Sequence, residues 1–87
     1  MKDPYVVLKH PLSTEKSVKM IESQNKLTFI VDVDATKKDI KTAIEALFKV
    51  KVVTVHTVVT PDGKKKAYIR SAPEHPALDV ATQLGMI

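Results

Sequence analysis

Lysine is the residue type in this chain with the most evident capacity to bind another molecule. The chain carries fourteen Lys and Arg, of which only Arg70 is an arginine, against ten Asp and Glu. The lysines gather at residues 37–41, where a helix is predicted to begin, and at residues 64–66, which read KKK. A lysine ammonium meets phosphate as a point charge, whereas arginine also offers a planar fork for reading base edges. The balance favours contacts to phosphates and to nucleic-acid shape over base reading.

The basic residues are confined to one part of the chain. Net charge is +4 and the pI is about 9.4. From residue 71 onward the only charged side chains are Glu74 and Asp79, so all fourteen basic residues lie in the first 70. A pI above about 9 in a compact domain is typical of nucleic-acid binding. From charge alone, a merely soluble basic protein is an equally good interpretation.

Groups suited to catalysis or to metal binding are sparse. None of the three histidines (His10, His56 and His75) has another His, Cys or carboxylate at metal-ligand spacing. With only two glycines and no Cys, the chain lacks phosphate-binding glycine loops, nucleophile elbows and thiolate sites. We therefore expect no enzymatic activity, no metal and no cofactor. The absence of Cys fits a reducing cytoplasm, and no apolar run approaches the roughly 20 residues of a membrane span.

The first half of the chain predicts two strands and two helices. Residues 5–8 predict a short strand, which residues 9–11 end because Pro11 removes a hydrogen-bond donor. A helix capped by Ser13 or Thr14 then runs to about residue 22, and a turn follows at 23–25. Alternating apolar residues over 27–34 predict a strand whose inward side chains are Leu27, Phe29, Val31 and Val33. A helix follows from the capping-box-like sequence TKKD at residues 36–39. Its apolar stripe is Ile40, Ala43, Ile44, Leu47 and Phe48.

The second half predicts a hairpin and a final helix. Val and Thr dominate residues 50–59, and PDG at 61–63 is a turn signal before a returning strand at 64–70. On that strand Ala67 and Ile69 face one way, and the side chains of Lys66, Tyr68 and Arg70 face the other. Pro76 and Gly85 suit the two ends of a last helix. The order β-α-β-α-β-β-α predicts a single α+β domain over residues 1–87, with a mostly antiparallel four-stranded sheet and helices packed on it.

Each basic or aromatic group has two explanations at this point. Three ammonium groups at residues 64–66 can project toward phosphates, or can protect an edge strand against aggregation. Lysines at residues 37–41 oppose the helix dipole, which is easier to understand if they meet phosphates, although a solvated helix face explains them nearly as well. Tyr68 can stack on a base or pack in the core.

Two further functions stay open from the residues. A module that binds another protein would hold its partner at high salt and after nuclease treatment. A single-strand RNA binder of the RRM type needs aromatic residues on two central strands, and this chain has only two Tyr and two Phe.

Four segments carry a recognisable pattern in order along the chain: residues 8–16 (LKHPLSTEK), 25–31 (NKLTFIV), 35–52 (beginning ATKKDI and ending LFKVKV) and 63–69 (GKKKAYI). Together they resemble the universal large-subunit ribosomal protein number twenty-three family. The first two segments resemble its N-terminal pattern and its Asn-led second strand, the third its central helix and the strand after it, and the fourth its hairpin return. Members often have Val-Asn-Thr where this chain has Val-His-Thr at 55–57. The connection at residues 60–63 is too short for the long basic loop of bacterial members, so the chain looks like the archaeal form.

The resemblance implies a ferredoxin-like-related ribosomal fold anchored on large-subunit rRNA beside the polypeptide exit tunnel. It also implies neighbouring large-subunit ribosomal proteins as partners, and a cytoplasmic, ribosome-bound location without membrane insertion. Ser13 and Glu15 would form part of a docking surface for the signal recognition particle and the protein-conducting channel; independently, Glu15 is a first-turn acid that stabilises its helix. The expected RNA contacts are Lys9, Lys16, Asn25, Lys26, Lys37, Lys38, Lys41, His56, Thr57, Lys64, Lys65, Lys66, Tyr68 and Arg70.

Overall fold

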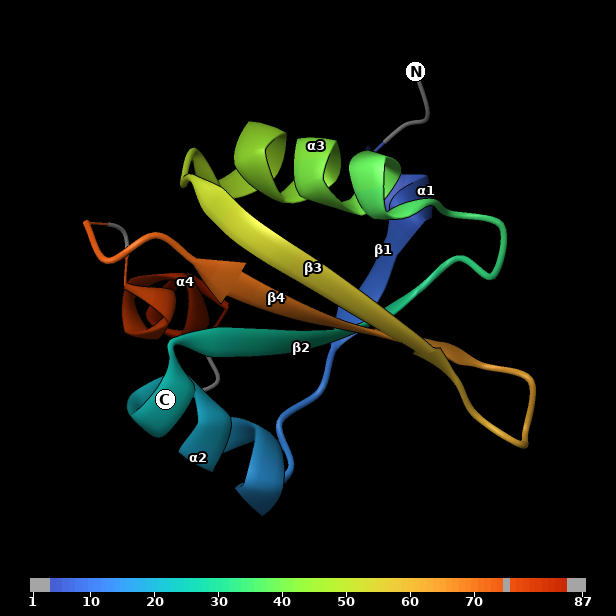
Figure 1. Ribbon diagram of the computed structural model, residues 1–87, viewed down its shortest axis with the longest axis horizontal. Helices are drawn as coiled ribbons and strands as arrows, with labels where there is room; N and C mark the ends of the chain where they lie inside the picture. Colours follow the sequence, from blue (N-terminus) through green and yellow to red (C-terminus); the bar gives the residue numbers. More distant parts are fainter. Residues whose placement is uncertain (1–3, 75, 85–87) are drawn as a thin grey trace.

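Four strands and four helices make up the computed structural model, which describes residues 4–74 and 76–84 (Figure 1). The expected order β-α-β-α-β-β-α is confirmed, with one short helical turn, α1, ahead of the first strand. The elements are α1 (Pro4–Val7), β1 (Leu8–Pro11), α2 (Glu15–Gln24), β2 (Lys26–Val31), α3 (Lys37–Phe48), β3 (Val52–Val59), β4 (Lys65–Ser71) and α4 (Ala77–Gln83). The predicted end of the last helix at Gly85 lies outside the described residues, as does His75.

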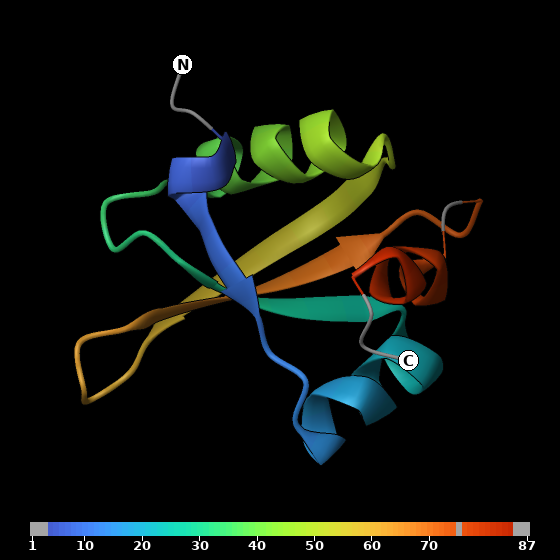
Figure 2. The ribbon, with the colours of Figure 1, turned by 180° about the vertical axis from the view of Figure 1, so that it is seen from behind.

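The strands form one antiparallel sheet in the order β1-β2-β4-β3. Ile69 of β4 lies between Leu27 of β2 and Val55 of β3 in the register. Beyond Val52 the register of β3 shifts, and the extra residue at this bulge is Val53, whose side chain is exposed. The hairpin of β3 and β4 projects beyond the rest of the sheet in both views (Figures 1 and 2).

One face of the sheet, which we call the inner face, carries the hydrophobic core. Side chains of β2 and β4 on this face pack with the apolar stripes of α3 and α4, and with Ile21 of α2. The predicted stripe of α3 is confirmed, and the ring of its Phe48 lies 6.3 Å from that of Phe29, centroid to centroid. Burying a large aliphatic or aromatic side chain contributes roughly 1.5–3 kcal/mol. The largest fully buried hydrophobic side chains are Leu27, Ile40, Ile44, Ile69, Val7, Val31 and Val80.

Side-chain caps begin the two longer helices. Thr14 caps α2, since its Oγ1 accepts a hydrogen bond from the Ser17 backbone N–H at 3.2 Å. The capping box of α3 is confirmed: Thr36 Oγ1 accepts from the Asp39 N–H, and Asp39 Oδ2 accepts from the Thr36 N–H, both at 3.1 Å. The helix α2 runs to Gln24, two residues beyond the predicted end, so residues 23 and 24 are helical and not part of a turn.

Two strand predictions are wrong at their boundaries. Residues 5–7 belong to α1, where Pro4 suits the first position of a helix, and the strand runs from Leu8 to Pro11, through the residues 9–11 that were expected to end it. The helical turn places Val7 in the core and beside α3. The second strand ends at Val31, where the chain turns through a bond from the Ala35 N–H to the Asp32 carbonyl. Val33 therefore lies outside the strand and is 50% exposed.

Candidate nucleic-acid interface

The sheet face opposite the core gathers basic and aromatic side chains, and we call it the outer face. Alternation along the strands places Lys66, Tyr68 and Arg70 there and Ala67 and Ile69 on the inner face, as predicted. The register arranges the outer-face residues in three rows across β2, β4 and β3: Lys26–Arg70–Thr54, Thr28–Tyr68–His56 and Ile30–Lys66–Val58.

The outer face is positively charged. None of its nine residues is acidic, whereas three carry a full positive charge. Arg70 and His56 are exposed, and Lys26, Lys66 and Tyr68 are half-buried. A one-sign surface of this kind attracts phosphates and releases their counterions on binding.

A hollow of about 230 Å³ lies where α2 meets the outer face, and we call it the Tyr68 hollow. It is lined by Lys16, Met20, Lys26, His56 and Tyr68. Four of these five residues were predicted as RNA contacts from the sequence, and the structure brings them together from three strands and a helix. Met20 was not predicted, although its position four residues after Lys16 on one helix face was a usable signal.

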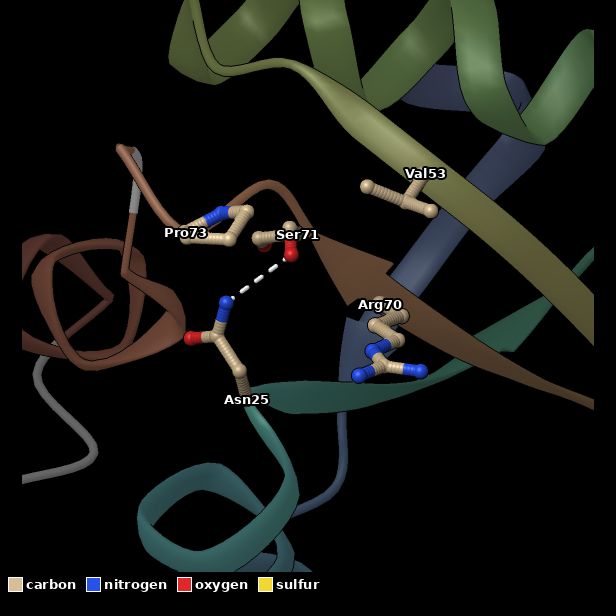
Figure 3. A pocket seen from close by; sticks show the side chains of 5 residues that line it. All are labelled: Asn25, Val53, Arg70, Ser71 and Pro73. Atoms are coloured by element: carbon tan, nitrogen blue, oxygen red, sulfur yellow. Dashed lines mark hydrogen bonds between the residues drawn. The ribbon is translucent and has the colours of Figure 1, made fainter.

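A second hollow, of about 530 Å³, lies beside Arg70 and is shown in Figure 3. Asn25, Val53, Ser71 and Pro73 complete its lining. The Arg70 guanidinium lies between the Asn25 end of β2 and Val53 of β3 (Figure 3). Val53 could not be predicted as a lining residue, because the bulge that exposes it depends on pairing with β4.

Asn25 uses its side chain inside the protein. Its Nδ2 donates to the Ser71 carbonyl at 2.9 Å (Figure 3), and its Oδ1 accepts from the Ala77 N–H at 2.5 Å. Its backbone is left-handed, with φ 55°, which Asn tolerates better than most residues. Asn25 thus joins the end of α2 to the end of β4 and the start of α4, and it shapes the hollow beside Arg70.

The three lysines at residues 64–66 do not project together, contrary to the sequence expectation. Lys66 lies on the outer face, whereas Lys65 lies on the opposite face, where its ammonium donates a bond of 2.7 Å to the Ala35 carbonyl. Lys64 is exposed in the turn that precedes β4. Strand alternation is the cause, since neighbouring side chains on a strand point to opposite faces.

The tip of the β3–β4 hairpin is a short closed turn. The Thr60 N–H donates to the Lys64 carbonyl at 2.7 Å, and Gly63 takes a left-handed φ of 83° that suits glycine. The Thr60 hydroxyl donates to the Asp62 carboxylate, and this bond, with smaller help from the Lys64 and Asp62 backbone and the Lys64 charge, lowers the pKa of Asp62. The predicted short hairpin connection is confirmed.

The other predicted RNA contacts lie away from the outer face. Lys37, Lys38 and Lys41 are exposed on α3 and line a hollow of about 210 Å³ with residues 53–55 at the edge of β3. Lys9 is exposed on β1, at the opposite edge of the sheet. Thr57 pairs with Ala67 and therefore lies on the inner face, not beside His56.

Ser13 and Glu15, the two predicted docking residues, are both exposed around the start of α2. The Glu15 carboxylate lies 3.4 Å from the Lys19 ammonium, with side chains 86% and 72% exposed. An ion pair this exposed contributes little to stability. Because its side chain is exposed, the Glu15 carboxylate is also accessible to a partner.

Neither a metal site nor a membrane span is found in the part of the chain that the structure describes. Within residues 4–74 and 76–84, no three His, Asp or Glu side chains gather closely enough to hold a metal ion. None of the helices in those segments has the length and apolar character needed to cross a membrane.

The comparison with known families agrees with the resemblance seen in the sequence. The family model described as ribosomal protein L23 matches residues 6–77, a stretch that contains the whole sheet together with α2 and α3. Proteins of this family are structural constituents of the large ribosomal subunit, associate with the ribosome and are typically non-enzymatic. The chain belongs to the ribosomal protein L23 family.

Proposed function

We propose that the chain binds large-subunit rRNA through its outer face and sits beside the polypeptide exit tunnel. The observation that carries this proposal is the gathering of Lys26, Lys66, Arg70, His56 and Tyr68 on one rigid sheet face that holds no acidic residue. Membership of the ribosomal protein family supplies the context in which the phosphates are those of rRNA.

The mechanism we propose is electrostatic anchoring combined with shape fit. Each lysine that neutralises a phosphate should add roughly −0.7 to −0.9 to the slope of log K against log salt. The antiparallel pairing of β2, β4 and β3 holds the basic residues at fixed spacing, so little order must be gained on binding. Backbone phosphates rather than base edges would supply most of the affinity.

A second set of RNA contacts is proposed around α3 and the hairpin. Lys37, Lys38 and Lys41 border the free edge of β3, and Lys64 lies at the hairpin turn. Lys9 extends the set to the other edge of the sheet. Such peripheral lysines would meet RNA that wraps past the sheet edges, whereas the internal bonds of Lys65 and Asn25 suit a supporting role.

We also propose that the start of α2 forms part of a docking surface for the signal recognition particle and the protein-conducting channel. The support is the accessible carboxylate of Glu15, with Ser13 beside it. In this proposal the chain acts as a cytoplasmic, archaeal-type short-loop form of the family, held among neighbouring large-subunit proteins, with its outer face toward RNA and with Ser13 and Glu15 at the start of α2 toward other proteins.

A salt titration tests the RNA-binding proposal. The double variant Lys66→Ala/Arg70→Ala should bind a large-subunit rRNA fragment more weakly, and its salt slope should be flatter by about 1.4–1.8. Lys19→Ala/Lys51→Ala is the matched control, because both side chains are exposed and neither belongs to the outer face. Equal slopes for the two double variants would show that the outer face is not the RNA-binding surface.

A further inference from the structure

The Tyr68 hollow differs from the rest of the outer face, because aromatic and basic side chains line it together. Tyr68 lies directly opposite His56 in the register of β4 and β3, so two flat rings occupy neighbouring strands on one face. Lys16 and Met20 approach from α2, and Lys26 approaches from β2. The hollow is therefore bounded by α2 as well as by the three strands.

The lining of this hollow suits a nucleobase with its phosphates. Tyr and His rings stack on unpaired bases, and the methionine thioether is a polarizable surface that adapts to a flat ring. The two lysines supply positive charge from α2 and from β2, and none of the five described lining residues is acidic. A base in a duplex has both of its faces covered by neighbouring bases, so only an unpaired nucleotide offers a free face to Tyr68.

We propose that the Tyr68 hollow holds the base of one unpaired RNA nucleotide, stacked on Tyr68, while Lys16 and Lys26 hold the flanking phosphates. This inference rests on the proposed RNA-binding function and adds a defined single-nucleotide site to it. A protein side chain in the hollow is the competing occupant, and the basic lining without an acid favours the phosphate-bearing ligand.

Filter binding with substitutions at Tyr68 tests the site. On the shortest large-subunit rRNA fragment that the full chain binds, Tyr68→Leu should weaken binding about tenfold with an unchanged salt slope, because it removes stacking but no charge. Tyr68→Phe keeps the ring and should bind as the unchanged chain does. Val58→Ala is the matched control, since Val58 is an exposed outer-face residue that does not line the hollow.

Abasic substitution identifies the nucleotide. Removing the base at one unpaired position should weaken binding by the unchanged chain about tenfold, and should not weaken binding by Tyr68→Leu any further. If every abasic position weakened both proteins equally, the single-nucleotide site would be wrong. If a protein side chain occupied the hollow instead, Tyr68→Leu would bind RNA as the unchanged chain does, and every abasic position would weaken both proteins equally. That result would also overturn the single-nucleotide site.

Ultraviolet cross-linking gives a readout that needs no substitution, which matters if Tyr68→Leu does not fold. Trypsin cuts after Lys66 and Arg70, so residues 67–70 form one peptide with Tyr68 as its only aromatic residue. This peptide should carry a cross-linked nucleotide. Cross-links found only in other peptides would overturn the Tyr68 site while leaving RNA binding intact, whereas an unchanged chain that binds no RNA fragment would overturn the proposed function itself.

Discussion

The ammonium of Lys65 on β4 donates a hydrogen bond of 2.7 Å to the backbone carbonyl of Ala35, which lies just before α3. This bond joins two segments thirty residues apart and holds the approach to α3 against the sheet. Strand alternation turns Lys65 away from Lys66, and Lys64 lies in the turn before β4, so the three lysines have three different environments. The KKK run is therefore not a single phosphate-binding unit.

The different environments of Lys65 and Lys66 predict different consequences of their loss. Lys66→Ala should flatten the salt slope of rRNA binding by about 0.7–0.9 with little change in stability. Lys65→Met keeps the aliphatic stem but leaves the Ala35 carbonyl without its donor, so the free energy of unfolding should fall by about 1 kcal/mol at an unchanged slope. Filter binding and urea denaturation measure the two effects. Similar salt slopes for the two variants would contradict this assignment.

Asn25 is expected to be important for stability through both its bonds and its backbone. Asn25→Gly tolerates the left-handed conformation but loses the bonds to Ser71 and Ala77, so the free energy of unfolding should fall by about 2 kcal/mol. The free energy of unfolding of Asn25→Ala should be lower by about 1 kcal/mol more, because alanine disfavours a left-handed φ of 55°. Urea denaturation measures both. If Asn25→Gly were as stable as the unchanged chain, the internal role of this side chain would be wrong.

The Asp62 carboxylate predicts a local acid sensitivity at the hairpin tip. The Thr60 hydroxyl lowers the pKa of Asp62 below its ordinary value of 3.8, so the ionised form favours the folded turn. This contribution is present above that ordinary value and is lost as pH falls through the lowered pKa. Asp62→Asn should lack this pH dependence. Amide NMR shifts of residues 60 and 62–64, followed from pH 5 downward in both proteins, provide the measurement, and identical profiles would rule the interaction out.

Charge reversal at Glu15 should separate docking from RNA binding. Glu15→Lys removes the exposed carboxylate and its pair with Lys19, and it places a cation at the start of α2. We expect weaker binding of the signal recognition particle to purified ribosomes, with normal incorporation of the chain into large subunits. Glu22→Lys is a suitable control, since it makes the same charge change at another exposed position of α2. Equal docking by the Glu15→Lys and Glu22→Lys ribosomes would exclude a specific role for Glu15.

The parts of the fold that depend on local sequence were predictable. The helix α3 was predicted with its cap and its stripe, because the TKKD box and the apolar spacing act within a few turns of chain. The two faces of β4 followed from alternation alone. By contrast, residues 5–7 were predicted as strand, because the β-branched Val6 and Val7 outweighed the local signal of Pro4 at the first helical position, and the packing of α1 beside α3 depends on the tertiary fold.

The candidate site was predictable as a set of residue types but not as an arrangement. Aromatic–basic alternation on β4 indicated Tyr68 and its neighbours. The position of α2 beside the outer face, which completes the Tyr68 hollow with Lys16 and Met20, depends on tertiary packing. The bond from Lys65 to Ala35 and the bonds of Asn25 also join distant segments, so no local pattern reveals them.

Sedimentation with large ribosomal subunits tests the central claim most directly. Subunits that lack their own copy of this protein would be mixed with the unchanged chain, with Lys66→Ala/Arg70→Ala, or with Lys19→Ala/Lys51→Ala, and separated on a sucrose gradient at increasing salt. The unchanged chain and the Lys19→Ala/Lys51→Ala control should remain with the subunit to similar salt concentrations, and the outer-face variant should dissociate at clearly lower salt. Retention of all three proteins to the same salt concentration would contradict anchoring through the outer face.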